Sequence, residues 1–468
     1  MKVKMRKLLV VVFSLCLSGL AVAELGQRIE GIIRQDSQKK ARFSIHIVKA
    51  DSGEVLYSNN ANEAMIPASN MKIIIGAAAL KYLGPNFVYK TKVGLCGNTL
   101  AVIGSGDPLL GDQKTDAKYG RQSGWIFEDI AAKLKERGVT TIGDIIVDAS
   151  VFDEERVHPN WPKDQLNQWY ACEVGGVNYN DNCIGITVKN VGGRAEIVIQ
   201  PQTDFVQIIN EVVLVSEGKD GVGAYRNLEP NKIIVKGKCN GQEGPFDVAI
   251  ERPGAFFGSL LSENLARGGV KMQGQLLVRA VGSDCDFKLV AEYSTSMADC
   301  LARCNKDSLA LAADALLKTI AASQQGGKNG SWATGRAMIS RYLSELGINE
   351  SEFYIDDGSG LSRENKLSAN AITKVLTDIY KGGSWGLYKD SLAAGGIDGT
   401  IRRYFKEEKY KGRIIGKTGF INGVRSFSGV CSSKDGDYIF SILANNSNGM
   451  SREAINDIAE AIIDETDM

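Results

Sequence analysis

Apolar and polar positions near the two ends of the chain follow strand and helix spacings in turn. Residues 42–58 alternate around an Asp51-Ser52-Gly53 turn, which predicts a β-hairpin. A continuous apolar run follows Pro67 and the polar residues after it, which predicts a buried helix whose first turn carries Ser69 and Lys72. Helical runs follow at residues 309–320, 334–346, 371–380 and 452–463. Three strand-like runs lie late in the chain, at residues 414–415, 424–431 and 438–444.

The middle of the chain has a different pattern, with short β-like runs separated by Gly, Asn and Asp. We expect residues 91–289 to form one or two inserted β-rich domains. The insertion would split another domain into residues 24–90 and 290–468. The predicted fold class is therefore α/β in the mixed α+β sense, with helices packed on an antiparallel sheet.

Residues 1–23 have the pattern of a cleaved signal peptide. Basic residues precede an uncharged apolar run over residues 8–20, and the segment ends in Ala21-Val22-Ala23. The alternative is a membrane anchor, but this run is short for the ~20 residues of a bilayer span. We therefore expect an exported protein, periplasmic, secreted or cell-wall associated, with no transmembrane segment in its mature chain.

Charge and composition narrow the function. The chain has 55 Lys and Arg against 55 Asp and Glu, so no basic excess is available to neutralise a nucleic acid backbone. Its two histidines, His46 and His158, are 112 positions apart, which disfavours a His-rich metal site and a Ser-His-Asp triad. If the protein is an enzyme, we expect a base other than histidine.

Eight cysteines follow the signal segment, and an even number in an exported chain favours disulfides. Cys172 and Cys183 flank a turn segment and are the preferred pair. Cys300 and Cys304 lie one helical turn apart, so they would pair together only with strain, or with other partners. A cysteine zinc site is disfavoured because no Cys-x-x-Cys is present.

The first candidate motif is Ser69-x-x-Lys72, which places a hydroxyl and an amine on one face of a helical turn. Burial lowers the pKa of an amine, and this would let Lys72 accept the serine proton. Ser37 and Lys40 have the same spacing but stand among charged residues with no apolar wall. The alternative for Ser69 is an ordinary helix N-cap.

The second candidate motif is the polar segment 357–365, in which Ser362 could relay protons and Asn365 could orient groups over a cleft. The alternative is a glycine-rich loop that ends in a helix cap.

The third candidate motif is Gly416-Lys417-Thr418-Gly419, where glycines on an edge strand leave room for a substrate backbone. The Lys417 charge could hold a carboxylate there. A phosphate-binding loop is excluded, because the spacing of the glycines is wrong and a strand follows.

Together and in this order, the three motifs are typical of penicillin-binding proteins and class A β-lactamases. The chain closely resembles the D-alanyl-D-alanine carboxypeptidase/endopeptidases of the class C low-molecular-mass penicillin-binding group. Its fold would then be a penicillin-binding/β-lactamase-like domain split by the insertion. Blocks that carry the resemblance are Pro67–Lys72, Gly104–Pro108, Asp357–Ser362, Gly396–Thr400 and Lys417–Ser428.

The resemblance implies roles for individual residues. Ser69 would attack the carbonyl of a D-Ala-D-Ala bond, and Lys72 would take its proton. Ser362 with Asn365 would relay a proton to the leaving amine. Lys417 and Thr418 would hold the terminal carboxylate, with Gly419 and Phe420 next to them on the same strand. The oxyanion hole would be formed by the backbone N–H groups of Ser69 and Phe420. No metal or organic cofactor is implied.

Two departures from the family pattern concern this site. The second motif is usually Ser-x-Asn, whereas the Asn nearest Ser362 is three residues on, at Asn365. The third commonly continues Lys-Thr-Gly-Thr, and Phe420 replaces that last threonine and its hydroxyl.

The implied function is that of a serine DD-carboxypeptidase, with an endopeptidase activity left open. Its partners would be peptidoglycan stem peptides, with β-lactams as inhibitors. The alternatives are a β-lactamase and a non-catalytic peptidoglycan-binding protein.

Overall fold

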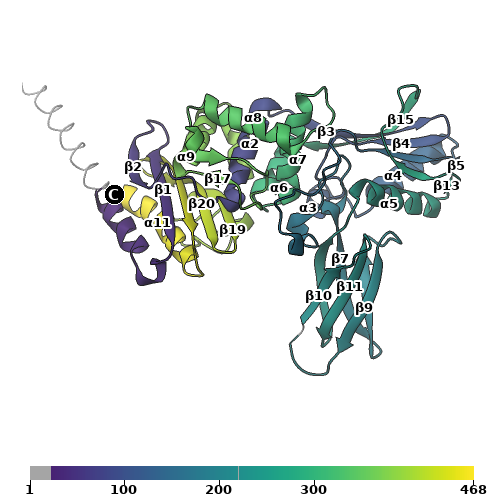
Figure 1. Ribbon diagram of the computed structural model, residues 1–468, viewed down its shortest axis with the longest axis horizontal. Helices are drawn as coiled ribbons and strands as arrows, with labels where there is room; N and C mark the ends of the chain where they lie inside the picture. Colours follow the sequence, from purple (N-terminus) through teal and green to yellow (C-terminus); the bar gives the residue numbers. More distant parts are fainter. Residues whose placement is uncertain (1–22, 220, 468) are drawn as a thin grey trace, which may run out of the picture. The chain divides into compact units, whose positions relative to one another are not determined.

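The computed structural model describes residues 23–219 and 221–467 of the protein (Figure 1). The predicted signal peptide, residues 1–23, lies outside the described residues except for Ala23. Contacts divide the chain into two units. Unit 1 takes the described residues up to Pro85, residues 301–309 and those from Arg336 onward, and unit 2 takes residues 86–300 and 310–335. The chain therefore enters and leaves unit 2 more than once.

Unit 1 contains a six-stranded sheet in the order β18-β19-β20-β21-β1-β2, in which every neighbouring pair is antiparallel. Figure 1 shows its first strands, in purple, beside the last ones, in yellow. The strands are β1 (Arg42–Lys49), β2 (Val55–Asn59), β18 (Ala393–Ala394), β19 (Ile414–Ile421), β20 (Val424–Ser433) and β21 (Gly436–Asn445). The predicted 42–58 hairpin and the three late strands are thus present.

Helices cover both faces of this sheet, as the alternation along β1 shows. Phe43, Ile45 and Ile47 belong to a buried cluster with the helical residues 23–33 and with α11 (Ser451–Thr466). The residue between them, His46, instead contacts Thr373 of α9 (Ala369–Lys381), with 2.6 Å between Nδ1 and Oγ1. Since successive strand residues point to opposite faces, α11 and α9 lie on opposite sides of the sheet.

Helix α2 (Met71–Tyr82) occupies the core of unit 1. Its residues from Met71 to Leu80 are all buried, as expected of a helix that is apolar all round. A short 3-10 turn, Ala68–Asn70, leads into it. Other elements that lie wholly or partly in unit 1 are α6 (Met297–Asn305), α8 (Trp332–Glu345), α10 (Trp385–Ser391), β16 (Phe353–Tyr354) and β17 (Lys366–Leu367).

Unit 2 is built around a five-stranded mixed sheet in the order β14-β6-β4-β3-β15. Its strands are β3 (Val88–Cys96), β4 (Thr99–Ile103), β6 (Ile145–Asp148), β14 (Leu276–Val278) and β15 (Phe287–Ser296). Three smaller sheets join it, made of β5 (Thr141–Ile142) with β13 (Lys271–Met272); of β7 (Cys183–Val191), β8 (Arg194–Gln200) and β12 (Gln242–Ala249); and of β9 (Gln207–Leu214), β10 (Gly221–Arg226) and β11 (Lys232–Cys239).

Unit 2 also contains helices that the sequence analysis did not predict. Helices α4 (Trp125–Glu136) and α5 (Pro253–Arg267) place Phe127 and Phe257 in the core of the unit, with ring centroids 5.3 Å apart. Helix α3 (Gln113–Lys118) was not predicted either, whereas α7 (Ala310–Ser323), also in this unit, matches the predicted helical run 309–320. The inserted region is therefore a mixed α/β structure as well.

The preferred disulfide pair, Cys172 with Cys183, is wrong, since both are buried free cysteines. The disulfide of the structure joins Cys96 and Cys285, whose Cα atoms are 5.4 Å apart. Strand pairing explains this link. Cys96 ends β3 and stands opposite Phe287 of the antiparallel β15, so Cys285 comes just before that strand at the same end.

No helix within residues 23–219 and 221–467 is both long and apolar enough to cross a bilayer.

Candidate active site

Ser69 stands in the 3-10 turn just before α2, and Lys72 lies in the first turn of the helix. The Lys72 ammonium donates to Ser69 Oγ across 3.1 Å, as their spacing of three residues predicts. Ser69 is half-buried, whereas Lys72 is 1% exposed. The predicted pair is thus in contact, with the serine half-buried and the lysine enclosed.

The glycine-rich segment after β16 holds this turn from the other side. Ser359 O accepts a second hydrogen bond from the Lys72 ammonium, at 2.6 Å. Gly360 has a φ of +81°, and a Cβ at this position would run into the backbone of Ala68. Glycine is therefore required there for two reasons: the left-handed backbone and the close approach to the turn that carries Ser69.

Lys417 lies on β19, beside the same turn. Its backbone oxygen accepts from Asn70 Nδ2 across 2.6 Å, and Asn70 Oδ1 accepts from Ser428 Oγ of β20, also across 2.6 Å. The neighbouring strand β18 pairs only with Ile415 and Gly416, so within the described residues β19 has a free edge from Lys417 onward. The predicted edge position of this lysine agrees with that pairing.

The Lys417 ammonium is fully buried and donates to Ser308 Oγ across 2.9 Å and to Thr418 O across 2.6 Å. Burial lowers the pKa of this amine well below its ordinary value, and the nearby positive charge of Lys72 lowers it further. Ser308 has a φ of +62° and stands between α6 and α7. A serine absent from the predicted site therefore lies directly on one of its lysines.

The residues after Lys417 continue along the free edge of β19. Thr418 Oγ1 and Thr400 Oγ1 are 2.8 Å apart. A Cβ at Gly419 would come within 2.9 Å of Ser69 N, so the strand can pass the turn this closely only with glycine at that position. Phe420 is 58% exposed, and the Arg425 guanidinium lies 4.5 Å from its ring centroid.

Ser362 and Asn365 have other partners. The Ser362 hydroxyl donates to Asp356 Oδ2 across 2.5 Å, and its backbone N–H donates to Asp357 Oδ2 across 2.8 Å. The Asn365 amide donates to Asp357 Oδ1 across 2.7 Å. Among the described residues neither side chain hydrogen-bonds to Ser69 or to a site lysine. The geometry instead has both residues holding the 357–362 segment in shape.

Sequence reasoning missed Ser308, Ser359 and Thr400 as members of this site. Ser359 contributes only a backbone oxygen, which leaves no residue-type signal. Thr400 stands in the 396–400 block that the family resemblance had singled out. Ser308 had one usable signal, its place just before the apolar helix α7. The Ser-x-Asn pattern of the second motif did not mark it, because the second residue after Ser308 is Ala310.

The described residues contain no group of three or more His, Cys, Asp or Glu side chains arranged to hold a metal ion. The polar groups gathered around Ser69 are hydroxyls, two amines and backbone amides. Such a set can activate a hydroxyl, hold a carboxylate and donate to a developing oxyanion.

Comparisons with known proteins agree with this chemistry. The model of the "D-Ala-D-Ala carboxypeptidase 3 (S13) family" matches residues 25–466. A D-alanyl-D-alanine carboxypeptidase of Actinomadura sp. (strain R39) is 27% identical, and the alignment covers 94% of this chain and 84% of that protein.

Solved structures share the fold. Penicillin binding protein 4 (dacB) from Haemophilus influenzae superposes with a TM-score of 0.78 at 22% identity, covering 95% of this chain and 99% of that one. The same protein in complex with a β-lactam gives a TM-score of 0.73 at 21% identity, covering 95% and 98%. The predicted fold class, a mixed α/β protein of penicillin-binding type, is confirmed.

Proposed function

The chain belongs to the D-Ala-D-Ala carboxypeptidase 3 (S13) family and is a serine-type DD-peptidase, and we propose that it acts through an acyl-enzyme on Ser69. The family and the enzyme class predicted from the three motifs are thereby confirmed. The observation that carries the proposal is the contact between the enclosed Lys72 side chain and the hydroxyl of the half-buried Ser69.

Lys72 is the proposed general base. Its amine is enclosed, and the distance of 3.1 Å between Lys72 Nζ and Ser69 Oγ lies within the range for proton transfer. The proton of Ser69 would pass to Lys72 Nζ as Oγ attacks the carbonyl carbon of the D-Ala-D-Ala bond. Ser359 O, the second acceptor on the ammonium, would then stabilise the protonated lysine.

The free edge of β19 is the proposed site for the substrate backbone. A peptide laid along this edge would pair with β19 as an added strand, and its terminal carboxylate would reach Lys417 and Thr418. Close approach of Gly419 to Ser69 N supports an oxyanion hole formed by the N–H groups of Ser69 and Phe420. One such donor contributes roughly 2.7–4 kcal/mol to transition-state stabilisation.

We assign proton delivery to Ser308, whose hydroxyl would give a proton to the leaving D-Ala amine and take one from the Lys417 ammonium. Its hydroxyl is held by the Lys417 ammonium, which gives it a polar partner within the site. Ser362 and Asn365, which the sequence had suggested for this step, are retained as positioning residues for the 357–362 segment. The acyl-enzyme would then be hydrolysed by water.

The natural substrates we propose are peptidoglycan stem peptides, with β-lactams as inhibitors that acylate the same serine. The β-lactam complex of the Haemophilus influenzae structural relative supports the second part. Such substrates lie outside the cytoplasmic membrane, in keeping with the export signal predicted for residues 1–23.

The test is D-Ala release from a soluble peptide that ends in D-Ala-D-Ala, measured by chromatography. The purified mature chain should release one D-Ala per peptide, and a matched peptide ending in L-Ala-L-Ala should stay intact. Absence of release from the D-Ala peptide would contradict the proposal. A cross-linked muropeptide in the same assay measures the endopeptidase activity.

Two alternatives have distinct outcomes in parallel assays. Rapid turnover of a chromogenic cephalosporin would indicate a β-lactamase. Binding to cell-wall sacculi without any acylation by penicillin would indicate a non-catalytic protein. We expect slow cephalosporin turnover, since the acyl-enzyme formed with a β-lactam should be long-lived.

A further inference from the structure

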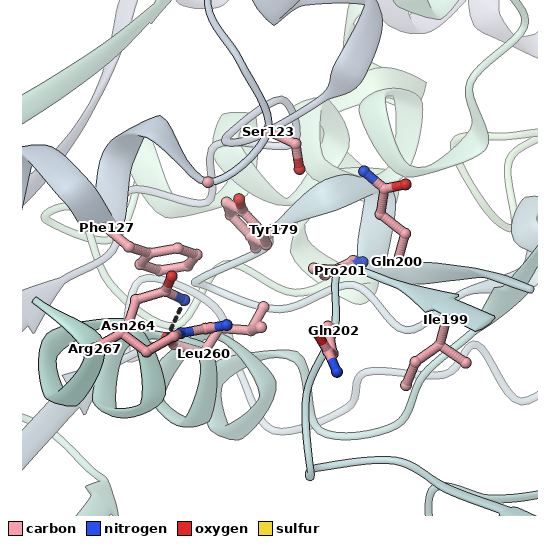
Figure 2. A pocket seen from close by; sticks show the side chains of 11 residues that line it. Ser123, Phe127, Tyr179, Ile199, Gln200, Pro201, Gln202, Leu260, Asn264 and Arg267 are labelled. Atoms are coloured by element: carbon pink, nitrogen blue, oxygen red, sulfur yellow. Dashed lines mark hydrogen bonds between the residues drawn. The ribbon is translucent and has the colours of Figure 1, made fainter.

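Unit 2 has a pocket of its own, with a volume of about 290 Å³. It lies between the start of α4, Tyr179, the segment that follows β8 and one face of α5 (Figure 2). The catalytic proposal uses none of its residues. The volume is just below the range of about 300–1,000 Å³ for drug-sized ligands, which suits a single compact ring rather than an extended chain.

The floor of the pocket is apolar and fixed by the core. Phe127, Tyr179 and Leu260 are each 1–2% exposed. The Phe127 and Tyr179 rings pack with centroids 4.8 Å apart, and Phe127 also packs on Phe257 beneath them. Because these rings belong to the main hydrophobic cluster of unit 2, the floor is already formed before any ligand arrives.

The rim of the pocket is polar. Ser123, Gln200, Gln202 and Arg267 are all exposed, and within the described residues none of their side chains hydrogen-bonds or pairs with another side chain. Figure 2 shows Gln200 and Gln202 on one side of the pocket and Arg267 on the other. A ligand between them could therefore receive hydrogen bonds from opposite directions.

Glu263 stands one helical turn before Arg267 on α5, where it could have neutralised the guanidinium. It instead accepts from Thr203 Oγ1 across 2.8 Å and from Asp204 N across 3.1 Å. These bonds anchor the segment that carries Gln202 to α5. The contact therefore fixes one wall of the pocket and leaves the Arg267 charge available to a ligand.

We propose that this pocket binds an amino-sugar unit of the peptidoglycan glycan strand. A pyranose ring has an apolar face that would lie against the narrow apolar floor, and the amides and the hydroxyl of the rim can hydrogen-bond to its hydroxyl and acetamido groups. Arg267 adds a preference for a sugar that carries a carboxylate. The inference rests on the proposed function, because that function makes peptidoglycan the substrate.

A peptide is the less suitable occupant. Proteins bind extended peptides mainly through rows of backbone hydrogen bonds at a sheet edge, with pockets for alternate side chains. The rim here is formed by side-chain amides, a hydroxyl and a guanidinium around one enclosed floor. That arrangement matches a ring with polar groups on its circumference.

The experiment is calorimetric titration of the full mature chain with peptide-free glycan strands, which carry free lactyl carboxylates. N-acetylglucosamine tetramer serves as the neutral comparison. We expect the wild type to bind the glycan strands more tightly than the tetramer. Arg267→Ala and Gln202→Ala should each weaken glycan binding about tenfold, the scale of one lost charged or polar contact.

Arg194→Ala is the matched control, because this exposed arginine starts β8, roughly 20 Å of strand away from the pocket at the other end. It should leave glycan affinity unchanged. Absence of glycan binding by the wild type, or equal affinity in Arg267→Ala and the wild type, would overturn the proposal.

A second pair of measurements separates this inference from the catalytic one. Arg267→Ala should react with penicillin and release D-Ala from a soluble peptide as fast as the wild type. Ser69→Ala should keep full glycan binding. If glycan binding is absent while D-Ala release is intact, the pocket proposal fails alone; if D-Ala release is absent while glycan binding persists, the proposed function fails alone.

Discussion

The Lys72 ammonium lies 3.1 Å from Ser69 Oγ and 2.6 Å from Ser359 O. Two acceptors from different parts of unit 1 thus fix an amine that is almost fully removed from water. In its uncharged form, an amine so held needs no rearrangement to accept the serine proton. The reactivity of Ser69 should therefore depend on a side chain at position 72 that can lose a proton.

Lys72→Arg tests this dependence, because the guanidinium keeps the charge but does not deprotonate. The rate of acylation by benzylpenicillin should fall about 10²–10⁴-fold, the usual contribution of a general base. The measurement is time-resolved labelling with a fluorescent penicillin. Lys81→Arg, at the exposed end of the same helix, is the control and should react at the wild-type rate. An unchanged rate in Lys72→Arg would exclude the lysine as base.

Ser308→Ala and Ser362→Ala distinguish the two hydroxyls that have been considered for proton relay. Ser308→Ala should slow acylation about 10²-fold or more at temperatures where the variant is fully folded. Ser362→Ala should instead destabilise unit 1 by about 1–3 kcal/mol, because it removes one hydrogen bond from the buried Asp356 carboxylate, which keeps its ion pair with Arg336. Labelling kinetics and thermal melts of both variants measure these effects.

The two variants give opposite results if the relay is at Ser362. In that case Ser362→Ala would lose labelling at temperatures where it is fully folded, and Ser308→Ala would react normally. Such a result would restore the assignment made from the sequence motif.

The pH dependence of carboxylate binding should follow the lowered pKa of Lys417. Below that pKa the ammonium is charged and holds the substrate carboxylate; as pH rises through it, the charge is lost and KM should increase. The alkaline rise in KM should therefore begin below the ordinary lysine range. A substrate amidated at its C-terminus provides the control and should show no such rise. Equal pH profiles for the two substrates would contradict the role of Lys417.

Asp107 in unit 2 should make stability depend on pH. Burial raises the pKa of this carboxyl to about 6, although Thr295 Oγ1 and Leu109 N both donate to it. The folded state therefore retains a proton that the unfolded chain releases near pH 3.9, so stability falls as pH rises from about 4 to about 6. The loss is about 3 kcal/mol at neutral pH.

The corresponding measurement is urea unfolding at about pH 4.5 and about pH 7.5. Asp107→Asn should gain stability relative to the wild type at the higher pH only. Asp286→Asn, which alters a carboxylate that is 84% exposed, should show the same difference from the wild type at both values. A pH-independent effect of Asp107→Asn would show that the group is ionised in the folded state.

The sequence predicted the parts of the site that are local in the chain. Ser69 and Lys72 share one helical turn, and Lys417 lies on a strand between nearby glycines. Their local placement could therefore be predicted from sequence spacing. The contact of the Ser308 hydroxyl with Lys417 depends instead on the path of the chain after α6 ends at Asn305, which no short motif records. Ser362 offered a better motif by composition, but folding directs its hydroxyl to Asp356.

The fold was predictable to a similar extent. Alternation and apolar runs located the hairpin of β1 and β2 and the late strands, because each is a continuous pattern. Helix α4 was missed although Ile126, Ile130 and Leu134 recur at helical spacing, since the surrounding glycines and strand-like runs suggested β structure. The Cys96–Cys285 link depends on the pairing of strands almost 200 residues apart, which sequence spacing does not contain.

The most direct measurement of the central claim is peptide mapping by mass spectrometry after reaction with benzylpenicillin. We predict one added penicillin per chain, located by fragmentation on Ser69 in the tryptic peptide over residues 50–72 and absent from Ser69→Ala. Ser37, which has the same spacing to Lys40, should remain unmodified. An adduct on any other residue, or labelling that persists in Ser69→Ala, would contradict the account.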